Sequence, residues 1–406
     1  MVSAVESALS PWVSQFKSKA NLPVLLRWGE AGSGVQYKLG EFDRPKVEIV
    51  IRQASAVPLL LSPTLETLGE AYVEGKIDVL GQVDDMLEIA HRMAEAGAQP
   101  ESRMARVMRS LTHSKKGDSE AVQYHYDVSN AFYQTWLDPA MVYSCAYFET
   151  GDETLEQAQQ KKLDHILTKI QLQPGQRLLD IGCGWGALVL RAAQKFGARC
   201  VGVTLSQNQF ELASERVRQA GLQDRIDIRL QDYRDVAGEF DRITSVGMFE
   251  HVGLKHLASY FAQIARLLAP GGWVMNHGIT STDANDGETA LGGGRFIDRY
   301  VFPQGELPHI STVLKTMQLG GLEALDVESL RRHYARTMQL WSQGFERSTD
   351  TLRPMVGEKR WRIWRIYLAG CQWAFERDEV SLYQVVCRKA GREARELPWS
   401  RRYIYG

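Results

Sequence analysis

The chain has 406 residues, of which 44% are hydrophobic and 24% charged, and its formal net charge at pH 7 is −1. This length allows two domains with cores of ordinary size, and the near-neutral charge gives no indication of a nucleic-acid partner. The sequence has neither an apolar run of about 18 residues that would span a membrane nor a basic and apolar leader, so we expect no span and no export.

The first part of the chain, residues 1–96, is predicted to be a small α+β domain. Its expected elements are a helix over Ser10–Lys19, strands over Val24–Trp28, Val35–Leu39 and Val47–Ile51, and helices from Thr64 onward. The strands are inferred from apolar and polar alternation, and the helices from apolar residues three and four positions apart. Residues 97–119 follow as a linker with a basic helical stretch from Arg103 to Lys116.

From Glu120 onward, strands alternate with helices, as a doubly wound sheet requires. The expected strands are Leu178–Ile181, Arg199–Val203, Ile226–Leu230, Phe240–Val246 and Trp273–Ile279. The expected helices are Glu153–Ile170, Gln207–Ala220 and His256–Leu268. The fold prediction is therefore α/β, with a Rossmann-like domain over residues 120–406 preceded by the small α+β domain.

The most informative motif is the glycine-rich turn after the first of these strands, which reads L-L-D-I-G-C-G-W-G. Gly182, Gly184 and Gly186 allow the backbone to turn sharply and to approach a ligand closely. The phosphate-binding spacing G-x-G-x-x-G is absent, which favours a ligand without a pyrophosphate, and S-adenosylmethionine is the commonest such ligand. The alternative is a tight strand-to-helix turn that binds nothing.

Polar residues at the ends of the neighbouring strands fit the same ligand. Asp180, at the end of the first strand, would order the turn or receive the amine of the methionine part. The acidic residue that usually follows the second strand is missing, so Thr204 and Gln209 would hold the ribose hydroxyls. Asp232 and Tyr233 follow the third strand, where methyltransferases commonly hold the adenine, although a surface turn explains them equally well.

Several further segments, taken in order, resemble cyclopropane-fatty-acyl-phospholipid synthases and the related mycolic acid cyclopropane synthases. They are Tyr124–Asp127, Phe132–Tyr133, Val142–Phe148, Gly247–Gly253 and Asn276–Ile279. The resemblance covers residues 120–390 densely and the N-terminal domain more weakly, through Leu68–Tyr72 and Gly75. It implies an S-adenosylmethionine-dependent methyltransferase that transfers a methylene group to the cis double bond of an unsaturated phospholipid acyl chain. The product would be a cyclopropane.

The resemblance also implies the site residues. Those assigned to the cofactor are Tyr143, Ser144, Asp180, Gly182, Gly184, Gly186, Thr204, Leu205, Gln209, Asp232 and Tyr233. The family is understood to use bound bicarbonate as the base, and its holders here would be Cys145, Glu250, His277, Ile279 (through its backbone) and Tyr334. Taken singly, these are also ordinary residues: a core cysteine, a helix-start glutamate and a buried histidine. Cys371 matches a position suspected as a nucleophile, and we interpret it as pocket lining.

Two alternative functions remain open at this point. The first is a methyltransferase that makes a methyl- or methylene-branched acyl chain, because loss of a proton from a neighbouring carbon of the same cation would give that product. The second, from another class, is a non-catalytic lipid carrier, since the N-terminal domain loosely resembles sterol-carrier-like domains. The intact glycine turn argues against the carrier.

A substrate in a bilayer implies peripheral docking on anionic phospholipid. Two stretches are candidates: Arg103–Lys116, and Arg353–Arg365, where basic residues alternate with tryptophans. The alternative is that both are helix faces packed on their own domain. Gly292–Ile297 is predicted to be a mobile lid over an acyl channel or an irregular loop.

The compartment and the assembly are also expectations. The five cysteines are odd in number and scattered, which predicts reduced thiols without metal or disulfides. We therefore expect a cytoplasmic protein at the inner face of the plasma membrane. The resemblance alone implies a homodimer.

Overall fold

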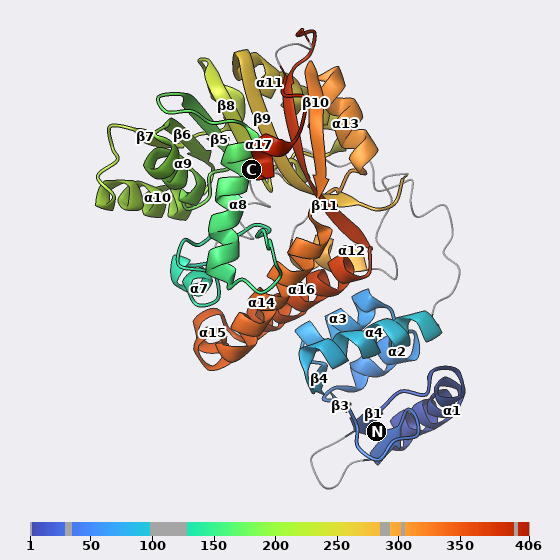
Figure 1. Ribbon diagram of the computed structural model, residues 1–406. Helices are drawn as coiled ribbons and strands as arrows, with labels where there is room; N and C mark the ends of the chain where they lie inside the picture. The colour runs from blue at the N-terminus through green and yellow to red at the C-terminus, as the bar shows by residue number, and fades with distance from the viewer. Residues whose placement is uncertain are drawn as a thin grey trace. The chain divides into compact units, whose positions relative to one another are not determined.

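The structure is a computed structural model that describes residues 2–28, 35–97, 128–284, 293–301, 305–393 and 397–405. The described residues fall into two compact units. The first unit takes them from 1–112, 288–303 and 345–373, and the second from 113–287, 304–344 and 374–406 (Figure 1). None of the helices in the described part of the chain is long and apolar enough to cross a membrane.

The first unit contains the predicted α+β region. Its elements there are α1 (Val2–Ala20), β1 (Val24–Trp28), β2 (Val35–Lys38), β3 (Val47–Ile51), α2 (Val57–Leu61), α3 (Leu65–Val73), β4 (Ile77–Leu80) and α4 (Val83–Gly97). The strands form one sheet in the order β2-β1-β3-β4, in which only β1 and β3 run parallel. The three expected strands are present, and β4 was not predicted. The predicted basic stretch Arg103–Lys116 lies outside the described residues.

Segments from the C-terminal half also belong to this unit, namely α12 (Gly293–Tyr300), α15 (Thr349–Val356) and α16 (Glu358–Glu376) up to Trp373. The irregular loop expected as one alternative at Gly292–Ile297 is wrong for residues 293–297, which are helical, whereas the lid stays a prediction. Phe296 and Tyr300 are buried one turn apart on α12. A Cβ at Gly69 would lie 2.7 Å from the Phe296 ring, so this glycine lets α3 and α12 pack closely.

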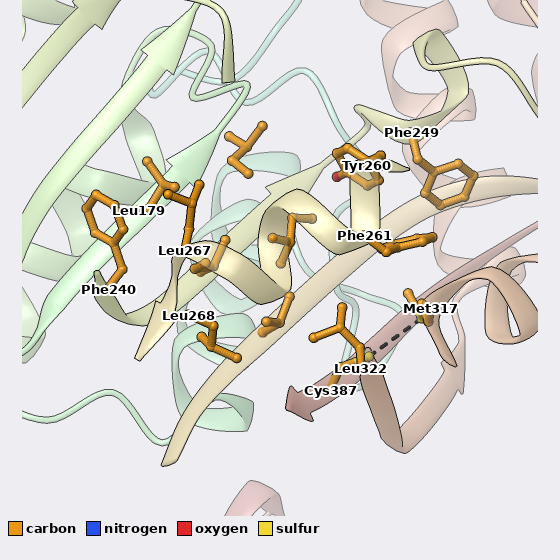
Figure 2. Packing of buried hydrophobic residues seen from close by; sticks show 14 of the residues in the cluster. Leu179, Phe240, Phe249, Tyr260, Phe261, Leu267, Leu268, Met317, Leu322 and Cys387 are labelled. Carbon is orange, nitrogen blue, oxygen red and sulfur yellow. Dashed lines mark hydrogen bonds between the residues drawn. The ribbon is translucent and has the colours of Figure 1, made fainter. Parts of the chain in front are cut away.

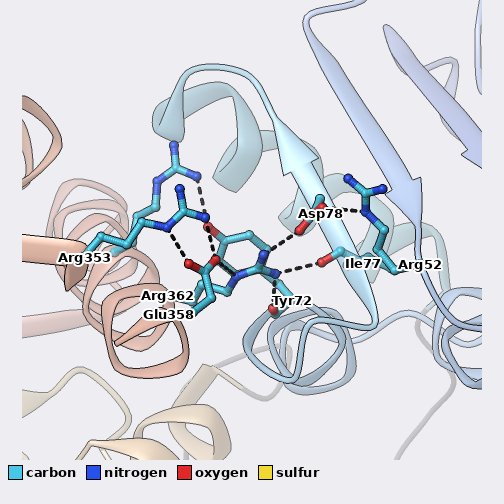
Figure 3. A network of polar contacts seen from close by, with 8 residues as sticks. Arg52, Tyr72, Ile77, Asp78, Arg353, Glu358 and Arg362 are labelled. Carbon is cyan, nitrogen blue, oxygen red and sulfur yellow. Dashed lines mark hydrogen bonds and ion pairs between the residues drawn. The ribbon is translucent and has the colours of Figure 1, made fainter. Parts of the chain in front are cut away.

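The predicted docking stretch Arg353–Arg365 is largely engaged inside the first unit (Figure 3). Arg362 donates to the carbonyls of Tyr72 and Ile77, at 2.8 and 3.0 Å, and also pairs with Asp78 and Glu358. The tryptophans of the stretch, Trp361 and Trp364, are only 6% and 4% exposed, and Arg365 pairs with Glu346. This stretch is therefore not the proposed membrane-facing surface, because its aromatic side chains are buried.

The second unit has a seven-stranded sheet in the order β10-β11-β9-β8-β5-β6-β7. The strands are β5 (Arg177–Ile181), β6 (Arg199–Thr204), β7 (Ile226–Leu230), β8 (Phe240–Val246), β9 (Leu268–Ser281), β10 (Leu322–Ser329) and β11 (Val380–Lys389). The helices are α7 (Asn130–Gln134), α8 (Leu155–Lys169), α9 (Ala187–Phe196), α10 (Gln207–Gln219), α11 (Leu257–Leu267), α13 (Ile310–Leu319), most of α14 (Arg331–Arg347) and α17 (Arg402–Tyr405). All neighbouring strands are parallel except the pairs made by β11.

Two hydrophobic clusters cover the two faces of this sheet. Leu179, labelled in Figure 2, and Ile181 pack in the cluster that includes α11. Leu178 packs in the other cluster, with α8 and α9. The alternation follows from the two-residue period of a strand. The strand order reverses at β5, which pairs with β6 on one side and β8 on the other. Open α/β sheets bind their ligands at the carboxyl end of such a switch point, so the site is expected after β5. The Rossmann-like prediction is confirmed.

Candidate active site

The glycine turn follows β5 directly and ends where α9 begins, with Gly186 as the N-cap. Gly182, Gly184 and Gly186 have φ values of +78°, +53° and +83°, a conformation that other residues adopt with strain. The backbone N–H groups of Gly182 and Cys183 both donate to the Val203 carbonyl at 3.0 Å, which ties the turn to β6. A Cβ at Gly184 would meet no atom within 4 Å, so the turn presents open backbone at this point.

The residues predicted to hold the ribose lie together at the end of β6. Thr204 Oγ1 donates to Gln209 Oε1 at 2.8 Å, and both side chains are buried. Leu205, between them in sequence, is 38% exposed. Asp232 caps a short turn and accepts from the backbone N–H of Arg234 at 2.9 Å, while the Tyr233 ring packs edge-on against Tyr260. The pair after β7 is thus part of an ordered turn.

A carboxylate and an ammonium lie buried near the turn. Asp180 is 3% exposed and accepts from Thr244 Oγ1 at 2.7 Å, and burial raises its pKa to about 6. Lys162, on α8, is 1% exposed, and its Nζ donates to Ser144 Oγ at 2.6 Å. In the described part of the chain no carboxylate forms an ion pair with this ammonium, and burial lowers its pKa to about 8. A buried cation with a neutral partner favours an anionic ligand group.

Aromatic rings hold the Tyr143–Ser144 segment beside the turn. Trp185, within the turn, has its ring 5.0 Å from that of Tyr133 and donates to Asn130 Oδ1 at 2.8 Å. The ring of Tyr143 lies 5.5 Å from Tyr133 and 5.1 Å from Trp341. These contacts place Tyr143 and Ser144 near the glycine turn, as predicted.

The second part of the site begins where β8 ends. Gly247 donates its N–H to the His277 carbonyl at 2.8 Å, which brings the following turn against β9. Ile279 then donates its backbone N–H to Glu250 Oε1 at 2.7 Å. A Cβ at Gly278 would lie 2.2 Å from the ring of Phe249, so glycine is required between these two partners. The backbone N–H of Ile279 therefore binds the carboxylate of Glu250, and its predicted role in holding bicarbonate stays a prediction.

Glu250 and His277 are buried, and each has one polar atom without a hydrogen-bond partner among the described residues. These atoms are Oε2 of Glu250 and Nε2 of His277. Burial raises the pKa of Glu250 to about 7 and lowers the pKa of His277 well below its usual value. The other ring nitrogen of His277, Nδ1, contacts Gln384 Nε2 at 3.1 Å. Buried polar groups in proteins normally have partners, so both atoms are available to a small polar ligand, as are other buried polar atoms without a partner among the described residues.

Cys145 and Tyr334 are linked to the same strands. The Cys145 thiol, fully buried, donates to the Leu330 carbonyl at 3.8 Å. Leu330 in turn donates its N–H to the carbonyl of Leu382, which pairs with Ile279 across β9 and β11. Tyr334 lies one turn after Leu330, 7% exposed. Burial raises the pKa of the Cys145 thiol far above neutrality, so the thiol is protonated and acts as a donor.

Cys371 does not belong to the same compact unit as the five residues assigned to bicarbonate. It lies in the part of α16 that belongs to the first unit, whereas the five belong to the second. Burial raises the pKa of its thiol to about 12. A protonated thiol is a poor nucleophile, which agrees with the interpretation that Cys371 does not attack the substrate.

Among the buried polar residues of this region, Lys162 and Lys169 on α8 and Gln384 on β11 were not predicted from the sequence. A signal was present in α8, because Lys162, His165 and Lys169 share the face of the helix that carries Ile166. Lysines at apolar positions of an amphipathic helix indicate buried charge. Gln384 stands alone in the apolar run of β11, where a single polar residue suggests a buried partner.

Comparison with known proteins gives two family matches. The profile of mycolic acid cyclopropane synthetase matches residues 113–385, which are most of the second unit together with later segments of the first. The profile of a domain of unknown function matches residues 12–102. The two matches meet near the predicted linker.

Individual relatives are similar over different lengths. A probable fatty acid methyltransferase of Pseudomonas putida is 44% identical over 388 residues, which cover 95% of this chain and 97% of that protein. The cyclopropane-fatty-acyl-phospholipid synthase of Escherichia coli K12 is 40% identical over 262 residues, covering 64% of this chain and 66% of that protein. A crystal structure of a mycolic acid cyclopropane synthase complexed with SAH and CTAB aligns with a TM-score of 0.64 and 35% identity, over 67% of this chain and 98% of that one.

Proposed function

Because the chain belongs to the mycolic acid cyclopropane synthetase family of S-adenosylmethionine-dependent methyltransferases, we propose that it forms cyclopropane rings in lipids. The substrate is the cis double bond of an unsaturated phospholipid acyl chain, which receives a methylene group from S-adenosylmethionine. The observation that supports this most directly is the pair of buried atoms without partners, Glu250 Oε2 and His277 Nε2, in the unit that carries the glycine turn. The names of the Pseudomonas and Escherichia relatives support an acyl chain as substrate.

The residues around the turn fit S-adenosylmethionine. The open backbone at Gly184 leaves room for the methionine part, and Thr204 and Gln209 would hold the ribose hydroxyls. We assign the methionine carboxylate to the buried ammonium of Lys162 beside Ser144, because it would give this ammonium a charged partner at hydrogen-bond distance. The SAH in the related crystal structure supports a cofactor of this class.

The second part of the site fits bicarbonate, a small anion with one hydroxyl group. When bound, bicarbonate supplies the base that removes a proton from the transferred methyl group, so that the ring closes. Glu250 Oε2 would accept a hydrogen bond from the hydroxyl group of bicarbonate, and His277 Nε2 would donate a hydrogen bond to another oxygen of the anion. Ile279 holds Glu250 in place through its backbone N–H, while Cys145 and Tyr334 supply further donors.

A second candidate is a methyltransferase that leaves a methyl or methylene branch on the acyl chain. The name of the Pseudomonas relative, which shares almost the whole length of this chain, favours it. Both reactions use the same cofactor and the same cation, and they differ in which carbon loses the proton. The site residues above serve either outcome.

The proposal is tested with methyl-labelled S-adenosylmethionine and vesicles of unsaturated phospholipid, with and without removal of dissolved bicarbonate. We expect label in the acyl chains and a loss of turnover when bicarbonate is removed, with recovery on its return. Turnover that persists without bicarbonate would overturn the assigned base. Calorimetry that shows no binding of S-adenosylmethionine would favour a lipid carrier instead.

We also propose that the protein is cytoplasmic, docks on the anionic inner face of the membrane, and acts as a homodimer. The support is the bilayer substrate and the basic residues between Arg103 and Lys116. Binding to anionic vesicles should weaken as salt rises, because screening shortens the reach of exposed charges. Glutamine at the five basic positions Arg103, Arg106, Arg109, Lys115 and Lys116 should weaken vesicle binding. Equal binding by that variant would exclude this stretch, and a monomeric mass in solution would exclude the dimer.

A further inference from the structure

A buried row of polar side chains in the second unit leads from α8 to His277. Lys169, at the end of α8, is completely buried, and its ammonium donates to Gln384 Oε1 at 3.1 Å. Gln384, on β11, is also completely buried and places its Nε2 3.1 Å from His277 Nδ1. Since Gln384 and His277 are direct cross-strand partners in the β11–β9 pairing, their side chains lie on the same face of the sheet.

The chemistry of Lys169 decides which way the amide of Gln384 points. An ammonium has three donors and no acceptor, so the atom of Gln384 that faces it must be the carbonyl oxygen. The NH₂ group of the amide therefore faces His277. The oxygen and nitrogen of a glutamine are otherwise hard to distinguish, and here the lysine removes the ambiguity.

Lys169 forms an ion pair with Glu328. Glu328, on β10, accepts from the Lys169 ammonium and, through the same oxygen, contacts His165 Nε2 at 2.8 Å. Although burial alone would raise the pKa of Glu328, His165 and Lys169 lower it to about 2. The carboxylate is thus ionised at neutral pH, and the ion pair stabilises the lysine as a donor.

The orientation of Gln384 in turn decides the tautomer of His277. An NH₂ group can only donate, so Nδ1 of His277 must be an acceptor and carries no proton. A neutral imidazole has one N–H, which is then at Nε2. That atom is buried and has no hydrogen-bond partner in the part of the chain that the structure describes.

We propose that Lys169 and Gln384 are positioning residues that lock His277 as an Nε2–H donor toward the bound anion. This rests on the proposed function, in which His277 faces bicarbonate. Neither residue touches the anion itself in this scheme. In this tautomer Nε2 of His277 presents an N–H and not a lone pair, which would repel an anion. The imidazole donates this hydrogen bond while it is neutral, so it adds no second positive charge to a site that binds a sulfonium cofactor.

The tautomer can be read directly from the ¹⁵N NMR spectrum of the histidine rings, with the His277 signals assigned by their loss in His277→Asn. In the parent protein we expect a bare Nδ1 and a protonated Nε2, with or without bicarbonate. A protonated Nδ1, or a doubly protonated ring, would overturn the proposal. This result is independent of the proposed function, because it needs no substrate and no turnover.

Variants test the two positioning residues separately. Gln384→Glu replaces the donor with an acceptor, so the proton of His277 should move to Nδ1, whereas Gln384→Met should allow both tautomers. Lys169→Gln should make the Nε2–H tautomer of His277 less dominant, and the matched control Lys195→Gln removes a half-exposed lysine that pairs with Asp164 on the surface.

We expect the bicarbonate concentration for half-maximal turnover to rise about 10- to 100-fold in the Lys169 and Gln384 variants, as for partners that orient metal-binding histidines. The control should not change it.

The outcomes separate the two hypotheses. If the variants shift the His277 tautomer but turnover does not depend on bicarbonate, the positioning role of Lys169 and Gln384 stands and the proposed base is contradicted. An unchanged tautomer and an unchanged bicarbonate requirement in folded Gln384→Glu would contradict the lock. If that variant does not fold, the parent spectrum and Gln384→Met decide the question.

Discussion

Replacing Glu250 with glutamine should abolish activity and stabilise the fold at the same time. The amide oxygen can still accept from the Ile279 N–H, the partner of Glu250 Oε1 at 2.7 Å. The other end of the side chain then presents an NH₂ group where Oε2 now lies buried without a partner among the described residues. An NH₂ group at that position cannot accept a hydrogen bond from the hydroxyl group of bicarbonate, so turnover should be lost.

The stability effect follows from the pKa of Glu250, which burial raises from its usual 4.5 to about 7. Between these two values the folded protein holds a proton that the unfolded chain has released, so stability falls as pH rises through this window. At about 1.4 kcal/mol per pKa unit, ionised Glu250 destabilises the folded state by about 3 kcal/mol above neutral pH. Glutamine removes this penalty. The variant should therefore be more stable than the parent by up to about 3 kcal/mol at about pH 8, and the difference should shrink toward about pH 5.

The assay combines methyl transfer to unsaturated vesicles with urea unfolding at the two pH values. Glu306→Gln is the matched control, because Glu306 accepts a backbone N–H, that of Leu254, at 2.8 Å but is only partly buried. It should show neither effect. Near-normal turnover of Glu250→Gln without added bicarbonate would refute the role of Glu250, and equal stability at both pH values would refute the electrostatic reasoning.

Three further variants test separate parts of the structure. Lys162→Met should weaken binding of S-adenosylmethionine about tenfold or more in calorimetry, since a hydrogen bond to a charged group contributes about 1.5–3 kcal/mol; unchanged affinity would contradict the assignment. Cys371→Ser should keep near-parental turnover, because the thiol of Cys371, with a pKa of about 12, is protonated and a poor nucleophile. A loss of turnover beyond about a hundredfold would instead indicate that Cys371 is a nucleophile. Arg362→Met should destabilise the first unit by about 2 kcal/mol in thermal unfolding, because it leaves the carbonyls of Tyr72 and Ile77 without this donor; an equal loss in Arg360→Met would show that the pairing is unimportant.

The sequence predicts best what depends on local chemistry. The turn requires positive φ values at Gly182, Gly184 and Gly186. Only glycine adopts this conformation without strain, so the sequence motif by itself predicts the turn. The strands β5 to β9 likewise follow local patterns of apolar residues, and they were found to within a few residues apart from the longer start of β9. The resemblance named Glu250 and Ile279 as site residues, but the hydrogen bond between them was not predicted.

What the sequence did not reveal depends on contacts between distant segments. β11 pairs antiparallel with β9 more than a hundred residues earlier, and only this pairing brings Gln384 to His277. Lys162 and Lys169 were not predicted, although they share the face of α8 that carries Ile166, because the sequence does not show which partners they meet there. The glycines before Phe296 suggested a loop, yet that segment is a helix whose Phe296 packs closely against Gly69. Tertiary packing overrode local preference in each case.

The proton NMR spectrum of the product phospholipid tests the central claim most directly. Cyclopropane and branched products gain the same mass, so mass alone does not separate them. The proposed reaction predicts cyclopropyl proton signals and the disappearance of the substrate's vinylic protons, in an amount that depends on bicarbonate. New vinylic signals of a methylene branch, or a plain methyl branch without ring protons, would contradict cyclopropane formation and identify the enzyme as a fatty-acyl methyltransferase.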